Sequence, residues 1–105
     1  MIDATSSLDR FAEPSLLIMA SLADGPKHGY AITKDVEALG GVALGPGTLY
    51  GALARLETKG LIEALPAEQR RHPYRLTALG ARALAEHLER LRAFADTGLV
   101  RLGAM

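Results

Sequence analysis

Residues 45–62 read GPGTLYGALARLETKGLI, and this stretch predicts one helix with a clear start and a clear end. Pro46 suits the first helical position because that position needs no amide hydrogen, and Gly45 before it is an acceptable N-cap. Gly60 marks the C-terminal end. Leucines at helical spacing predict one buried face, formed by Leu49, Leu53 and Leu56.

The opposite face of this helix carries small, polar and aromatic residues: Gly47, Thr48, Tyr50, Gly51 and Arg55. Arginine and threonine near a helix N-terminus reach base edges and phosphates, and a tyrosine hydroxyl can bond a phosphate. This face therefore suits a helix that enters a groove of DNA. The residues alone leave open a plain solvated surface.

Two further helices are predicted before this one. The first begins at Glu13 and ends at the Asp-Gly-Pro of residues 24–26. The second spans residues 28–39 and is ended by two glycines. Its inward residues are expected to be Ile32, Val36 and Leu39.

Two short strand-like runs, residues 61–65 and 74–77, predict a β-hairpin after the third helix. The polar connection is longer than a two-residue turn, so residues 67–72 are expected to form an extended, mobile tip. Arg75 lies within the second run and is expected to pair with Glu63 across the hairpin. The arginines of the tip are interpreted as phosphate or minor-groove contacts, with a solvated loop as the alternative.

A long helical pattern follows Thr77, which can act as its N-cap. Apolar or small residues repeat along it at heptad spacing: Leu84, Leu88, Leu91, Ala95, Gly98 and Leu102. This stripe predicts packing either on the first helix of the same chain or on a second copy. Because Gly98 lowers helix propensity, the helix is expected to break near residues 97–98.

The composition fits one small protein domain of 105 residues without cysteine, so neither a disulfide nor a thiolate metal site is expected. No apolar run approaches about 20 residues, the length of a membrane span, and the N-terminus lacks signal-peptide character. We expect a soluble, cytoplasmic protein. The 12 basic and 12 acidic residues balance, yet residues 66–82 hold four arginines against a single acid, Glu68.

Three separated blocks carry a resemblance to a known family. They are residues 25–32 (GPKHGYAI), residues 45–62, and residues 70–77 (RRHPYRLT) with Leu79-Gly80. In this order they resemble the PadR family of transcriptional regulators. The resemblance implies a mainly α fold with a small β-hairpin wing, that is, a winged helix-turn-helix plus a C-terminal dimerisation helix. It divides the chain into an N-terminal arm (1–12), a winged-helix DNA-binding domain (13–80) and the dimerisation helix (81–105).

The resemblance also implies a function: a homodimeric repressor that binds a palindromic operator in double-stranded DNA. Tyr30 is either a core aromatic or a phosphate contact beside the DNA backbone, with Lys27 and Lys34 as supporting charges. The full set of expected DNA contacts is Lys27, Tyr30, Lys34, Gly47, Thr48, Tyr50, Gly51, Arg55, Arg70, Arg71 and His72. Dimerisation is expected through Leu84, Leu88, Leu91, Ala95 and Leu102.

Other functions have weaker support. In some PadR-like proteins, aromatic groups at the dimer interface bind flat apolar effectors, and here only Phe11 and Phe94 could do so. A winged-helix module that binds protein instead of DNA is the main alternative, given the zero net charge. An enzyme is not expected, because His28, His72 and His87 are dispersed and no His-Glu-x-x-His motif occurs. No cofactor or metal is expected.

Overall fold

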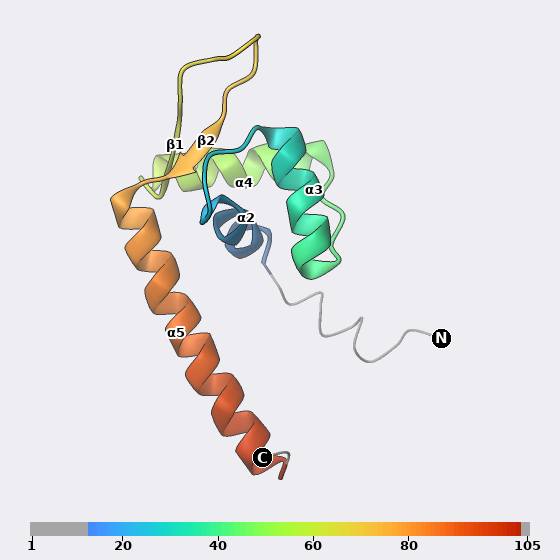
Figure 1. Cartoon of the computed structure of the whole chain (residues 1–105), viewed down its shortest axis with the longest axis vertical. Helices are drawn as coiled ribbons and strands as arrows, with labels where there is room; N and C mark the ends of the chain where they lie inside the picture. Colours follow the sequence, from blue (N-terminus) through green and yellow to red (C-terminus); the bar gives the residue numbers. More distant parts are fainter. Residues whose placement is uncertain (1–12, 104–105) are drawn as a thin grey trace.

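The computed structural model describes residues 13–103, so the predicted arm, residues 1–12, lies outside the described part. Helices dominate these residues, and a two-stranded antiparallel hairpin follows the third of them (Figure 1). The elements are α2 (Pro14–Leu22), α3 (Gly29–Gly40), α4 (Pro46–Thr58), β1 (Ile62–Ala64), β2 (Tyr74–Leu76) and α5 (Ala78–Arg101). No helix within this part has the length and hydropathy of a membrane span.

Helix α4 begins and ends as its sequence predicts. Pro46 occupies its first turn after the N-cap Gly45, and Gly60 takes a left-handed φ of 74° just beyond its end. That conformation suits glycine because it has no Cβ. The predicted leucine face of α4 is buried.

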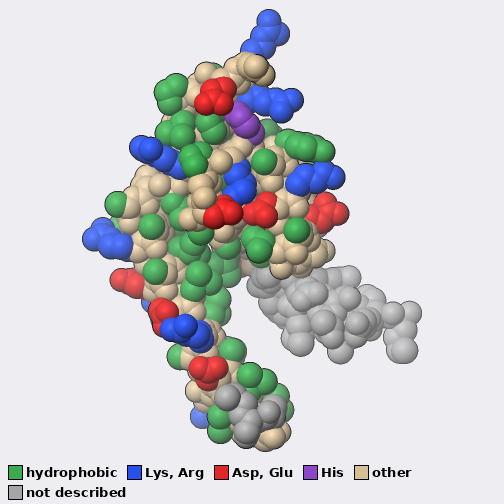
Figure 2. Space-filling model, viewed as in Figure 1, with side chains coloured by type: hydrophobic (Ala, Val, Ile, Leu, Met, Phe, Trp, Pro, Cys, Tyr) green, Lys and Arg blue, Asp and Glu red, His purple; other side chains and the backbone are tan. Residues whose placement is uncertain are grey.

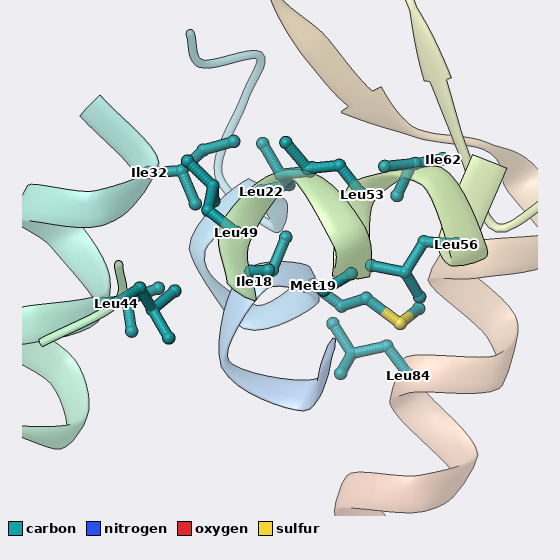
Figure 3. Packing of buried hydrophobic residues seen from close by; sticks show 12 residues of the cluster. Ile18, Met19, Leu22, Ile32, Leu44, Leu49, Leu53, Leu56, Ile62 and Leu84 are labelled. Atoms are coloured by element: carbon teal, nitrogen blue, oxygen red, sulfur yellow. The ribbon is translucent and has the colours of Figure 1, made fainter. Parts of the chain in front are cut away.

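The core lies where α2, α3 and α4 meet. Ile18 of α2, Ile32 of α3 and Leu53 of α4 are fully enclosed, and the other buried side chains surround them (Figure 3). Ile62 of β1 and Leu84 of α5 complete the cluster, which ties the hairpin and the long helix to the body. Each such side chain contributes on the order of 1.5–3 kcal/mol by its removal from water.

Helix α3 follows the prediction except at Leu39. Ile32 and Val36 are buried as expected, but the Leu39 side chain is 57% exposed, so its predicted inward position is wrong. The side of α3 that faces α2 instead ends at Gly40, where a Cβ would lie 3.0 Å from a methyl carbon of Leu17. The Leu17 side chain occupies the space there, and Leu39 falls at the edge of the buried face.

The hairpin pairs in the register Ile62↔Leu76, Glu63↔Arg75 and Ala64↔Tyr74. The predicted Glu63–Arg75 pair is confirmed, with Nε of Arg75 donating to Oε1 of Glu63 at 2.6 Å. One more hydrogen bond, from the Leu65 amide to the Pro73 carbonyl at 2.8 Å, extends the ladder toward the tip.

The tip of the hairpin differs from the expected open loop. Glu68 and Arg71 exchange two backbone hydrogen bonds of 2.7 and 2.9 Å, which leaves a two-residue turn at Gln69 and Arg70. These two residues have φ values of 49° and 70°, and positive φ at both positions is what a type I′ turn requires. The prediction missed the turn because the usual Asn-Gly or Asp-Gly signal is absent.

Helix α5 begins at the predicted cap, since the Thr77 hydroxyl accepts a hydrogen bond from the Gly80 amide at 3.0 Å. Gly80 also lets the helix approach the hairpin, because a Cβ there would overlap the carbonyl oxygen of Leu61. The helix then runs unbroken to Arg101, so the break expected near residues 97–98 is wrong. A single interior glycine costs only about 1 kcal/mol relative to alanine. This cost is too small to interrupt a helix that has regular turns on both sides of Gly98.

Candidate nucleic-acid interface

The surface of α4 that points away from the core is built from small residues. Gly47, Gly51, Ala54 and Thr58 follow one another at helical spacing opposite the buried leucines. Three of them are exposed and Gly51 is half-buried. Sequence reasoning missed Ala54 and Thr58, although their spacing from Gly47 and Gly51 could have indicated them. We call these four residues the exposed face of α4.

The predicted polar contacts of α4 lie on the two flanks of this exposed face. Tyr50 lies on the flank that faces the hairpin. Arg55 lies on the other flank, and it lines a groove of about 220 Å³ between α2, the end of α4 and α5, together with Lys59 and His87. The exposed residue Thr48 precedes Arg55 by seven residues, or about two helical turns, and lies on the same side of the helix.

A hollow of about 390 Å³ lies between the start of α3, the first turns of α4 and the hairpin. We call it the wing hollow. It gathers all three tyrosines of the chain with basic residues of the hairpin tip. Its lining residues are His28, Gly29, Tyr30, Tyr50, Arg70, Arg71, His72 and Tyr74.

Two contacts bring these distant segments together. Lys27 and Tyr74 exchange backbone hydrogen bonds of 3.1 and 2.9 Å, so the segment before α3 runs beside β2. Gly29 lies directly against Tyr50: a Cβ at Gly29 would come within 2.7 Å of the Tyr50 hydroxyl oxygen. All three sequence blocks singled out above therefore meet at the wing hollow.

The wing hollow has a positive character. None of its lining residues is an aspartate or glutamate, whereas Arg70 and Arg71 both border it. Burial raises the pKa of the Tyr74 phenol above its ordinary value, and Glu57 and Tyr50 raise it further. That phenol is therefore neutral near pH 7 and able to donate a hydrogen bond. Figure 2 shows Lys and Arg side chains at the hairpin end of the molecule next to a histidine.

The two histidines of the wing hollow differ in their partners. Nδ1 of His72 lies 3.1 Å from the carbonyl oxygen of Leu65. Since a carbonyl only accepts, His72 donates from Nδ1. Nδ1 of His28 is buried and has no hydrogen-bond partner within residues 13–103.

The predicted DNA contacts from α3 and from the segment before it differ in whether they are free to meet DNA. Tyr30 is exposed rather than in the core, and the Lys34 ammonium lies 5.7 Å from the centre of its ring. Lys27, in contrast, directs its ammonium to the Ser21 carbonyl and the Asp24 carboxylate. The hydrogen bond from Lys27 lowers the pKa of Asp24. The Lys27 charge is thus already paired within the chain, and its role in DNA binding stays a prediction.

The predicted dimerisation stripe divides into two parts. Leu84 is only 5% exposed because it packs in the core of its own chain, beside Met19 and Leu56. The remaining members, Leu88, Leu91, Ala95 and Leu102, are exposed. Phe94 is 77% exposed on the same helix, and Phe11 lies outside the described residues.

Comparison with protein families shows which family this chain resembles. The model of the transcriptional regulator PadR-like family matches residues 18–86. A curated relative, an uncharacterized 37.1 kDa protein in transposon TN4556 of Streptomyces fradiae, is 48% identical over 75 residues, or 71% of this chain. The matched part spans only 22% of that relative.

Solved structures with the same fold include three bacterial regulators. A PadR-like transcription factor from Bacteroides fragilis is 25% identical with a TM-score of 0.74, over 90% of this chain and 95% of that one. A PadR family regulator from Clostridium difficile is 29% identical with a TM-score of 0.73, over 84% and 95%. One from Eggerthella lenta is 31% identical with a TM-score of 0.71, over 93% and 87%. The predicted fold class is confirmed.

Proposed function

The chain belongs to the PadR-like family of transcriptional regulators, and from this premise we propose that it binds double-stranded DNA as a homodimer and represses transcription from a palindromic operator. The family consists of transcriptional regulators, in agreement with the prediction that the chain is not an enzyme. The observation that carries the proposal is the position of the exposed face of α4 beside the wing hollow.

The exposed face of α4 suits close contact with a DNA groove. Because Gly47, Gly51 and Ala54 carry little or no side chain, the helix backbone can approach base edges closely. Arg55 and Thr48 on one flank can then reach bases, since arginine pairs with the O6 and N7 atoms of guanine. Tyr50 and the wing hollow on the other flank can hold the sugar-phosphate backbone.

The exposed part of α5 supports the homodimer. Apolar side chains of α5 beyond Leu84 stay exposed among residues 13–103, and a second copy of α5 would cover them. A two-fold dimer places two recognition helices on two half-sites, which is why we expect the operator to be palindromic. We also propose that the protein is cytoplasmic. As a separate proposal, the Phe94 ring contacts a flat apolar effector.

A winged-helix module that binds a protein partner is the second candidate. The zero formal net charge favours it, and so does Arg75, whose charge is offset by Glu63. Arg70 and Arg71 favour DNA instead, because within residues 13–103 neither has a carboxylate within ion-pair distance.

Sequencing of the DNA fragments that the purified protein retains from a random pool tests the proposal. We expect enrichment of an inverted repeat. Arg55→Ala should then reduce the preference for this operator by about 1–3 kcal/mol, if Arg55 makes a bidentate base contact. Arg90→Ala, an exposed arginine of α5, is the matched control and should leave the preference unchanged. Retention of no sequence above background would favour the protein-binding alternative.

A further inference from the structure

We propose that the wing hollow binds one phosphate of the DNA backbone and that His72 is a ligand of this phosphate only when its ring is protonated. The inference rests on the proposed function, because DNA supplies the phosphate. The inference further implies that the protein takes up a proton when it binds DNA.

The hydrogen bond of His72 determines which of its nitrogens can face a ligand. Nδ1 must carry a proton, since it lies 3.1 Å from the Leu65 carbonyl oxygen, which can only accept. A neutral imidazole has a single N–H, so Nε2 of neutral His72 has a lone pair. A phosphate oxygen is also an acceptor and gains nothing from that lone pair. Only the imidazolium form can donate from Nε2 to a phosphate.

The hairpin itself holds the His72 ring in this orientation. The Leu65 amide donates to the Pro73 carbonyl at 2.8 Å, so the carbonyl that binds His72 belongs to the paired part of the hairpin. Pro73, the residue after His72, is buried. The backbone pairing of Leu65 therefore holds the carbonyl that His72 contacts, and we expect the Nδ1 contact to persist when DNA binds.

The charges around His72 link protonation to phosphate binding. Arg70 and Arg71 lie on the same hairpin tip, where Glu68 is the nearest acid along the chain. The groups that face the hollow from other elements are His28 and Tyr30 at the start of α3, Tyr50 on α4, and Tyr74 on β2. Glu57 of α4 lies outside this lining, and its charge raises the pKa of Tyr74. No carboxylate lines the hollow. A bound phosphate would carry the negative charge that a protonated His72 and the two guanidinium groups attract.

Phosphate is the anion that fits this lining best. Guanidinium groups bind phosphate through paired N–H donors, and the tyrosine hydroxyls add neutral donors on the other wall of the hollow. The hollow also adjoins Tyr50, on the flank of the exposed face of α4. A phosphate in it would belong to the strand that borders the groove entered by α4.

DNA titrations as a function of pH test the proposal. We would measure the dissociation constant of the full chain for the selected operator, or for a mixed-sequence duplex, at constant salt between about pH 8 and about pH 6, where histidine titrates. With one linked proton, affinity should rise about three- to tenfold as the pH falls over this range. His72→Asn keeps an N–H donor for Leu65 but has no second nitrogen, and its affinity should be independent of pH.

Two further histidine variants serve as controls. His87→Asn on α5 and His28→Asn in the same hollow should both retain the pH dependence of the wild type. The proposal is overturned if the wild type binds DNA with no pH dependence, or if His72→Asn keeps that dependence. Thermal melting of each variant at both pH values verifies that all are folded.

Inorganic phosphate separates this proposal from the proposed function. The ring nitrogens of His72 can be followed by NMR during a phosphate titration of the full chain. If the protein binds no DNA at any pH, the proposed function fails, and so does the assignment of the hollow to a DNA phosphate. If DNA binds, inorganic phosphate should compete with it for the hollow. Phosphate binding should also make the Nε2 proton of His72 observable by NMR. An unchanged His72 signal would overturn its role as a ligand.

Discussion

The body formed by α2, α3 and α4 differs from the second half of α5, although both carry apolar residues at helical spacing. In the body, Leu53 is 1% exposed, because helices of the same chain cover it. On α5, Leu88 is 45% exposed, and hydrophobic side chains continue along the exposed helix (Figure 2). Periodicity thus indicates that a face will be covered, but it does not identify what covers it.

The largest effect is expected for Leu53→Ala, which would test the packed side of this comparison. Removing the side chain leaves a cavity in the core, at a cost of about 2–5 kcal/mol in the free energy of unfolding. Urea denaturation measures this loss. The matched control is Leu88→Ala at a protein concentration low enough to give monomers, where we expect almost no loss. Equal losses in the two variants would show that α5 is covered by its own chain.

Leu88→Asp tests the exposed side of the comparison and should have the next largest effect. Sedimentation of the wild type at micromolar concentration should give about twice the chain mass of 11.1 kDa. The variant should shift toward monomer, with the dimer dissociation constant raised on the order of tenfold or more, because a carboxylate would be buried without a partner. Arg90→Asp, off the apolar stripe, should remain dimeric. A monomeric wild type would refute the dimer.

Most of the fold could be predicted because its signals are local. The start of α4 at Pro46, the cap at Thr77 and the buried leucines each depend on residues within a few positions of one another. The three errors have different physical origins. Gly40 rather than Leu39 lies against the Leu17 side chain, a turn formed without its usual residues, and a helix continued through Gly98.

The candidate site could be predicted only in part. Tyr30, Tyr50 and the tip arginines were chosen from three separate blocks, but their meeting in one hollow depends on two tertiary contacts. The Lys27–Tyr74 backbone pair and the packing of Tyr50 on Gly29 leave no trace in residue spacing. The pairing of Lys27 with Asp24 is local, at a spacing of three residues, and was missed because Lys27 was assigned to DNA.

Thr77→Ala should have a smaller effect, at the junction of the body and α5. The Thr77 side chain accepts from the Gly80 amide at 3.0 Å and donates to the Gly60 carbonyl at 2.6 Å. Loss of both bonds should lower the free energy of unfolding by about 1–2 kcal/mol. The control is Thr58→Ala, because the Thr58 hydroxyl only bonds the Ala54 carbonyl of its own helix. That variant should be neutral or slightly stabilising, as alanine is the better helix former.

The smallest effect on stability is expected at the wing tip, and it should be a gain. Gln69 and Arg70 have φ values of 49° and 70°, a region that costs residues with a Cβ roughly 1 kcal/mol each. The pair Gln69→Asn with Arg70→Gly matches the type I′ turn. The gain in unfolding free energy should stay below about 1 kcal/mol, because glycine also adds conformational freedom to the unfolded chain.

DNA affinity should fall in the double variant while stability rises. This variant therefore separates the contribution of the turn to stability from its contribution to DNA binding. The double variant loses the Arg70 charge, so its binding should weaken for all sequences and its log–log salt slope should flatten by about one. Gln69→Asn alone is the control, since it improves the turn and keeps the charge, and its DNA binding should match the wild type. If the double variant is more stable and also binds DNA with an unchanged salt slope, Arg70 makes no phosphate contact. An arginine in a left-handed turn would then have no function to offset its conformational cost.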